Sequence, residues 1–190
     1  AISSIRPRNA FNNTAMDVTL VGTDFFWSPS IVCSYGADIQ ADPTYVSTSS
    51  VVCPLAADYA GTAEAIGLSF DGGATTVWSP EDFTFVPYPM IVEASPLRGS
   101  QAGGEIVTVT GHNFFQSDDI VAFFNQSQAS PCTWSSATAI LCVTPAIDFY
   151  AEGMPASEIR VSQNEGFQFI EGFPRFQVDV TLHLGEVAGE

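Results

Sequence analysis

The sequence predicts an all-β protein made of two β-sandwich domains in tandem, and three observations lead to this prediction. The segment Val18–Phe26 returns 89 residues later as Val107–Phe115. Short runs rich in Val, Ile, Phe and Thr alternate with clusters of Gly, Pro, Asn, Asp and Ser, and no segment of useful length has a helical period. Four cysteines divide two and two between the copies. A repeat this long indicates complete domains, because solenoid repeats run at roughly 20–50 residues.

In the first copy, alternation of apolar and polar residues predicts eight short strands, each bounded by turn-forming residues. These strands span Ile2–Arg6, Met16–Gly22, Ser30–Tyr35, Thr44–Ser47, Ser50–Pro54, Ala65–Phe70, Thr75–Trp78 and Asp82–Val86. Between the sixth and seventh runs, Asp71-Gly72-Gly73 supplies the positive φ that a tight hairpin requires.

The second copy repeats this order. Its predicted strands span Met90–Ser95, Glu105–Gly111, Ile120–Asn125, Cys132–Ser135, Ala139–Val143, Glu158–Ser162, Phe167–Ile170 and Arg175–Leu184. Seven or so short strands in about 90 residues are typical of an immunoglobulin-like sandwich. The last run is longer than a typical strand. It indicates a long final edge strand, the start of a following domain, or an edge open to strand addition by a partner.

The domain boundary is expected at Pro87-Tyr88-Pro89, which gives domains over residues 1–88 and 89–190. Two prolines in three residues favour an extended, semi-rigid spacer. No apolar run approaches the roughly 20 residues of a membrane span, so we expect no direct membrane insertion. With no initiator Met and no signal segment, the chain is expected to be a soluble piece of something larger or a mature product.

The chain is strongly acidic, with a formal net charge of −16 and no lysine. Nine acids face two arginines in residues 1–89, and twelve face three in residues 90–190. Affinity for nucleic acid comes largely from Lys and Arg that neutralise phosphates, so both copies should repel it. Anionic membrane surfaces are disfavoured for the same reason. The acidity fits plain solubility, a basic partner, or a cation-rich or saline medium.

The cysteine count predicts one disulfide within each copy, Cys33–Cys53 and Cys132–Cys142, and an oxidising compartment. Buried free thiols and a metal site are the alternatives, but a metal needs clustered ligands that these spacings do not supply. Glycosylation acceptor triplets at Asn12 and Asn125 agree with an extracellular location.

No catalytic constellation is visible, so we expect a non-enzymatic protein without a cofactor. His112 follows a glycine at the end of a strand and is expected to face solvent. No nucleophile elbow, phosphate loop or zinc-protease motif occurs. Asp118-Asp119 could help to bind calcium, but no array of acidic ligands accompanies it, and solvated loop charges are the plainer interpretation.

Several segments of the second copy resemble the IPT/TIG domain family. They are Pro96–Ser100, Gly103–Phe114, and the run from Cys132 to Cys142-Val143-Thr144-Pro145. This resemblance covers nearly all of residues 90–178 and implies an immunoglobulin-like sandwich of the E-set type. The first copy is more diverged. It lacks the Gly-Gly pair and has Pro43 where the second copy has Cys132, so its disulfide must be placed differently.

Several positions can be given physical roles. Gly103-Gly104 suits a tight turn, and Gly22 and Gly111 are expected to end a strand where the backbone turns. Phe25 and Phe114 are expected to plug the end of each sandwich. Their neighbours form a candidate contact surface, because an exposed apolar cluster marks an interaction site; the alternative is that they cap the core. The candidate residues are Phe26, Trp27 and Phe115.

The resemblance implies a structural or interaction module of a larger cell-surface receptor, adhesion or surface-assembly protein, with protein partners outside the cell. The IPT/TIG family also includes DNA-binding transcription factors, but the charge and the cysteines argue against that branch. A rival function is an accessory module, with glycan as its ligand, in a secreted polysaccharide-acting enzyme. That function would require coplanar exposed aromatic residues on one sheet face, for which Trp27, Trp78 and Trp134 are the candidates.

Overall fold

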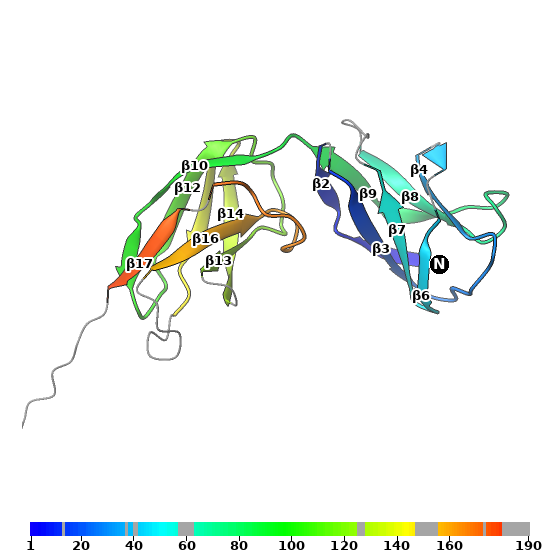
Figure 1. Ribbon diagram of the computed structural model, residues 1–190, viewed down its shortest axis with the longest axis horizontal. Helices are drawn as coiled ribbons and strands as arrows, with labels where there is room; N and C mark the ends of the chain where they lie inside the picture. Colours follow the sequence, from blue (N-terminus) through cyan, green and yellow to red (C-terminus); the bar gives the residue numbers. More distant parts are fainter. Residues whose placement is uncertain are drawn as a thin grey trace, which may run out of the picture. The chain divides into compact units, whose positions relative to one another are not determined.

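The computed structural model describes residues 1–12, 14–36, 38–39, 42–56, 63–124, 128–146, 156–172 and 174–179 (Figure 1). Within these ranges every regular element is a β-strand, as the sequence predicts. The described part of the chain has no helix that could cross a membrane. The chain divides into two compact units, Ala1–Tyr88 (unit 1) and Pro89–Glu190 (unit 2).

Unit 1 is a sandwich of two sheets. One has the strand order β1-β3-β7-β6 and the other β2-β9-β8-β4-β5. Side chains from both sheets, among them Leu20, Val51, Ile66 and Phe83, are fully buried in one core. Its strands are β1 (Ile2–Arg6), β2 (Asn9–Phe11), β3 (Met16–Gly22), β4 (Val32–Tyr35), β5 (Asp38–Ile39), β6 (Thr44–Ser47), β7 (Ser50–Leu55), β8 (Ala63–Ser69) and β9 (Val77–Val86).

Unit 2 forms one eight-stranded sheet in the order β10-β12-β15-β14-β13-β16-β17-β11. Strand β14 connects its two halves: the beginning of β14 pairs with β13, and the rest, from Cys132, pairs with β15. Val107, Ile140 and Ile159 are fully buried in unit 2. Its strands are β10 (Met90–Ser95), β11 (Arg98–Ser100), β12 (Ile106–His112), β13 (Val121–Phe124), β14 (Gln128–Ser136), β15 (Ala139–Val143), β16 (Ala156–Ser162) and β17 (Arg175–Asp179).

Two strands that the sequence analysis missed occupy equivalent places in the two units. In unit 1 the chain leaves β1 and continues as β2 in the opposite sheet, where it pairs parallel to β9. In unit 2 it leaves β10 and continues as β11, which pairs parallel to β17. Both are three residues long, too short for a hydrophobic alternation to be recognised.

Other strand predictions need correction. The predicted run Thr75–Trp78, from Val77 onward, and the run Asp82–Val86 belong to one strand, β9, which pairs with β8 through an irregularity between Ala65 and Gly67. Phe167–Ile170 is not a strand. The backbone there remains in a turn because the side-chain oxygen of Asn164 accepts a 2.8 Å hydrogen bond from the N–H of Gln168. The predicted last strand is described to Asp179, and its remainder lies outside the described residues.

Strand β3 ends at Gly22, as predicted, whereas β12 runs one residue beyond Gly111. Neither glycine has positive φ; the left-handed residues are Asp24 (62°) and Asn113 (59°), two positions later. The two glycines instead permit a close approach. A Cβ on Gly111 would overlap the carbonyl oxygen of Met90 and lie 2.6 Å from Cζ of Phe114, and Gly22 has the equivalent neighbours. Each phenylalanine ring therefore packs directly against the backbone at the end of a strand, because glycine has no side chain there.

Candidate contact surface

Two loops lie side by side at one end of unit 1, namely the β3–β4 and β8–β9 loops (Figure 1). The hydroxyl of Ser28 donates a 2.6 Å hydrogen bond to the carbonyl of Phe70 and accepts one from the N–H of Ser30 at 3.1 Å. The N–H of Gly72 donates to the carbonyl of Ser30 at 2.8 Å. These bonds fix the two loops to each other.

The β8–β9 loop is also fixed internally by a buried serine. The Ser69 hydroxyl donates to Oδ1 of Asp71 at 2.7 Å and accepts from the N–H of Gly73 at 2.9 Å. Thr75 donates to the Asp71 carboxylate through its hydroxyl at 2.6 Å and its N–H at 2.9 Å. Chiefly because of the Thr75 hydroxyl, these bonds lower the pKa of Asp71 from 3.8 to about 2. The carboxylate therefore stays ionised at neutral pH.

Three aromatic residues, Phe26, Trp27 and Phe70, lie on these two loops, and we call them the aromatic tip. Phe25 is 3% exposed and belongs to the core, as predicted, whereas Phe26 is 56% and Trp27 68% exposed. The ring of Phe26 stacks on that of Phe70, with centroids 4.4 Å apart and an interplanar angle of 24°. Phe70 in turn lies 6.2 Å from Phe25, between centroids. The tip is thus anchored to the core on one side and open to solvent on the other.

Unit 2 builds the same two-loop scaffold between β12 and β13 and after β16. The hydroxyl of Ser117 donates to the carbonyl of Gln163 at 3.1 Å and accepts from the N–H of Asp119 at 3.0 Å. The N–H of Glu165 donates to the carbonyl of Asp119 at 3.0 Å. Ser162 and Asn164 repeat the bonds that Ser69 and Asp71 make in unit 1, except that Nδ2 of Asn164 donates to Oε1 of Gln168 at 3.2 Å where Asp71 accepts from the Thr75 hydroxyl. The two scaffolds therefore correspond in all but this bond.

On this common scaffold the side chains differ. Gln163 takes the place of Phe70; it is fully buried, and its Nε2 donates a 2.6 Å hydrogen bond to the carbonyl of Phe115. Gln116 takes the place of Trp27, and Phe115, the counterpart of Phe26, is half-buried. The fold consequently does not require aromatic residues at the positions of Trp27 and Phe70. The sequence analysis missed Phe70, which it placed only as the end of a strand.

The predicted contact residues therefore lie in two different units. Phe26 and Trp27 are adjacent exposed residues of the β3–β4 loop in unit 1, while Phe115 occupies the position of unit 2 that corresponds to Phe26. The three tryptophans also lie on different elements. Trp27 is in a loop, Trp78 is on β9 against Gly67, and Trp134 is on β14, where its indole N–H donates to the carbonyl of Phe114 at 3.2 Å.

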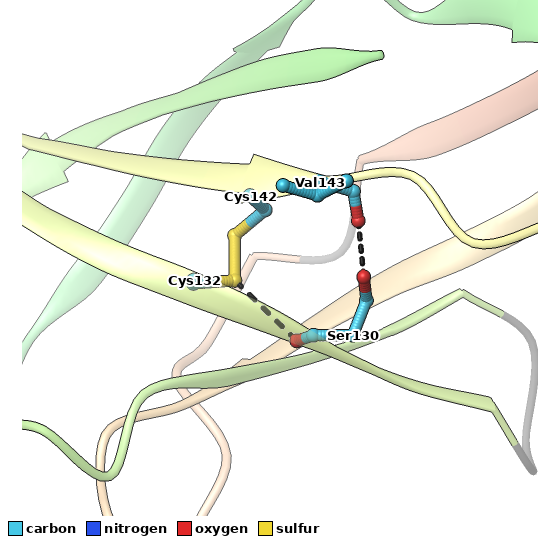
Figure 2. The surroundings of a disulfide bond; sticks show 4 residues. All are labelled: Ser130, Cys132, Cys142 and Val143. Atoms are coloured by element: carbon cyan, nitrogen blue, oxygen red, sulfur yellow. Dashed lines mark hydrogen bonds between the residues drawn. A yellow bond between two sulfur atoms is a disulfide. The ribbon is translucent and has the colours of Figure 1, made fainter. Parts of the chain in front are cut away.

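The four cysteines form two disulfides, and these differ in kind. Cys33–Cys53 connects β4 to β7, so it joins the two sheets of unit 1. Cys132–Cys142 connects the neighbouring strands β14 and β15 (Figure 2). Beside it, the Ser130 hydroxyl donates to the carbonyl of Val143, across the point where β14 changes partner.

The remaining candidate residues form no site. Asn12 is half-buried and its backbone N–H donates to the carbonyl of Val86 at 2.8 Å; Asn125 lies outside the described residues. His112 is exposed on β12. The N–H of Asp119 is used by Ser117 in the loop scaffold. Within the described ranges, no three His, Cys, Asp or Glu side chains are grouped so that they could hold a metal ion.

Comparison with known proteins identifies the second unit. Residues 89–170 match the IPT/TIG domain family. Fibrocystin-L of Homo sapiens is 27% identical over 148 residues, which are 76% of this chain and 4% of that protein. Plexin-A2 of Mus musculus is 32% identical over 103 residues, 52% of this chain and 5% of that protein. The chain thus spans only a small fraction of either relative.

The fold is also similar to that of a solved extracellular region. The full extracellular region of plexin A4, domains 1 to 10, has a TM-score of 0.54 with 14% sequence identity. The match covers 94% of this chain and 16% of that one. At this identity the similarity shows the fold alone.

Proposed function

Because residues 89–170 of this chain are an IPT/TIG domain, we propose that the chain is a non-enzymatic interaction module in the extracellular region of a larger cell-surface protein. Residues 1–88 are a second, diverged domain of the same kind in this proposal. The match to Fibrocystin-L is longer than unit 2 and so extends into unit 1. The two loop scaffolds, which share their hydrogen bonds, support the same view.

An extracellular location is supported by the disulfides. Each unit has its own bond, Cys33–Cys53 or Cys132–Cys142. Structural disulfides persist in oxidising compartments and are rare in the cytosol. A receptor, an adhesion protein and a surface-assembly protein all fit this location.

The observation that carries the proposal of protein binding is the aromatic tip. Exposed aromatic residues on a rigid scaffold are enriched where proteins bind each other, because they bury a large area with little loss of conformational entropy. Unit 2 shows that the same loops fold with glutamines instead. Trp27 and Phe70, which the fold does not require, are therefore best explained by a contact that they make.

The rival carbohydrate-binding function is less well supported. A flat glycan platform needs coplanar aromatic rings on one sheet face. Trp27 is on a loop and Trp78 is on β9 in unit 1, and Trp134 is on β14 of unit 2. None of the three shares a strand with another.

The test is to display the chain on beads and probe it in parallel with an array of extracellular protein domains and an array of glycans. We expect binding to a protein that is reduced in the variant Trp27→Gln/Phe70→Gln, which carries the unit 2 residues. The matched control Gln116→Ala, at the equivalent position of unit 2, should bind as the unmodified chain does. Binding to a glycan, lost in the same double variant, would favour the rival function.

A further inference from the structure

The aromatic tip offers ring faces to a ligand without needing to rearrange. One face of Phe26 is covered by Phe70, and the side chain still leaves 56% of its surface exposed. Trp27 is more exposed than any other large apolar residue described in either unit. The β3–β4 and β8–β9 loops, which carry these residues, are held in place by hydrogen bonds of Ser28 and Ser69. A partner would therefore meet an ordered surface with little entropy left to lose.

Carboxylates adjoin this surface. Asp24 lies two residues before Phe26, and Asp71 directly follows Phe70; both carboxylate residues are exposed. The arginines of unit 1 lie elsewhere: Arg6 is on β1 opposite Thr19, and Arg8 lies 3.6 Å from Glu81 on β9. This end of unit 1 thus combines π faces with negative charge, and both attract a guanidinium or an ammonium group.

From this combination we propose that the aromatic tip of unit 1 binds a segment of another protein that presents an arginine or lysine beside an apolar side chain. The inference rests on the proposed protein-binding function and specifies the partner's chemistry. The apolar side chain covers Phe26, and the cation lies over the Trp27 ring within reach of Asp24 and Asp71.

Other occupants fit less well. A second copy of this chain carries a net charge of −16 with no lysine, so it would be repelled. An anionic polysaccharide would be repelled for the same reason. A neutral glycan could stack on the rings and donate hydroxyl hydrogen bonds to the carboxylates, but it offers no charge that complements them. The charge pattern therefore favours a basic protein segment.

The three tryptophans provide the experiment with internal controls. The whole chain, labelled with ¹⁵N, is titrated with the synthetic peptide Ac-GSLRLRGS-amide while the indole N–H resonances are followed. We expect the Trp27 resonance to shift in a saturable way, with those of Trp78 and Trp134 unchanged. The peptide Ac-GSLELEGS-amide should bind at least about tenfold more weakly, because two favourable charge contacts become repulsive.

Unit 2 supplies the matched variants. Asp24→Asn and Asp71→Asn introduce the residues found at Asn113 and Asn164, which keep the left-handed backbone and the serine turn. The double variant should bind the arginine peptide at least about threefold more weakly. Its affinity for the peptide should also change much less with salt concentration than that of the unmodified chain. Trp27→Gln/Phe70→Gln should abolish binding, which is measured by titration calorimetry because this variant has no Trp27 resonance; unchanged resonances of Trp78 and Trp134 relative to the unmodified chain show that the fold is intact.

The inference is overturned if both peptides shift Trp27 equally, if millimolar peptide shifts none of the indoles, or if neutralising the carboxylates has no effect. Failure of the inference is separate from failure of the proposed function. If a protein partner binds equally well to the variants with substitutions in the aromatic tip, the proposed protein-binding function is supported and the tip is not its binding site. A shift of Trp27 by neutral cellohexaose, unchanged in the asparagine variant, would count against both.

Discussion

At the scale of single residues, equivalent positions in the two units show what the fold requires and what it leaves free. Gly111 and Phe114 repeat Gly22 and Phe25, and both rings are 3% exposed. The sequence repeat predicted the burial of these rings and the strand end at Gly22, but not the close approach that both glycines permit. Identical residues do not reveal whether a glycine serves a turn or a close approach, because that depends on a neighbouring strand.

The close approach at Gly111 leads to a stability prediction. Gly111→Ala should destabilise unit 2 by about 1–3 kcal/mol, since the new Cβ overlaps the Met90 carbonyl and the ring of Phe114. Denaturant unfolding, followed by the fluorescence of Trp134, would measure the loss. Thr110→Ala, at an exposed neighbouring position, is the control and should cost much less. An unchanged midpoint for Gly111→Ala would mean that the strand end relaxes freely.

A second residue-scale prediction concerns pH. The pKa of Asp71 is lowered in the folded protein from 3.8 to about 2. Its contribution to stability is therefore fully present above about pH 4 and is lost as the pH falls toward 2. In Asp71→Asn, which copies Asn164, the stability of unit 1 should no longer decrease through this window on account of that group. Unfolding midpoints between pH 5 and 2 test this, and equal slopes for both proteins would contradict it.

At the scale of elements, strands with an unbroken alternating pattern were predictable and the three-residue strands were not. Strands such as β3 and β15 match the predicted bounds because an alternating pattern over five or more residues identifies them. The three-residue strands β2 and β11 have no such pattern; their pairing with β9 and β17 depends on the distant strand. Phe167–Ile170 resembles a strand in composition, yet the Asn164 side chain fixes a turn. Local patterns could not show these long-range or side-chain bonds.

The two disulfides allow a prediction for each sandwich. The Cys33–Cys53 bond closes a sequence separation of 20 residues, and removing it by replacing both cysteines with Ala should cost unit 1 about 3 kcal/mol in the chain-entropy model. Removing Cys132–Cys142, with its separation of 10, should cost unit 2 slightly less. Thermal unfolding of the two double variants checks whether each loss stays within its own unit. A variant that lowers both transitions equally would contradict this assignment.

At the scale of the whole molecule, the repeat and the cysteine count made the fold class predictable, whereas the aromatic tip was only half visible. Phe26 and Trp27 stand out in the sequence. Phe70 follows Phe26 by 44 residues, and only the structure shows that the two are brought together, by the stacking of their rings and by the hydrogen bond from Ser28. The sequence also could not show that Gln163 replaces Phe70, because the offset between these two loops differs from that of the rest of the repeat.

The net charge of −16 leads to a prediction for the intact chain. Counter-ion release from phosphates needs Lys and Arg, and five arginines among 21 acids cannot provide it. The chain should therefore not shift a DNA duplex, even at low salt, where such contacts are strongest. A gel-shift titration tests this. Micromolar binding that weakens with salt would show that a local arginine surface outweighs the overall charge.

The last prediction concerns the proposed division into domains at residues 1–88 and 89–190. Each part has its own buried core and its own disulfide. The apolar surface that stabilises a sandwich lies between strands of the same part, so neither should need the other to fold. Tyr88 belongs to the first part, because its ring packs edge-on against Phe11 at 5.2 Å between centroids. Both pieces, expressed separately into an oxidising compartment, should be monomeric, retain their native disulfide and unfold cooperatively. A first piece that ends before Tyr88 should be less stable than one that includes it, since the Phe11 contact is lost. If either piece remained unfolded while the whole chain folded, the boundary would be wrong and the two sandwiches would form a single cooperative unit.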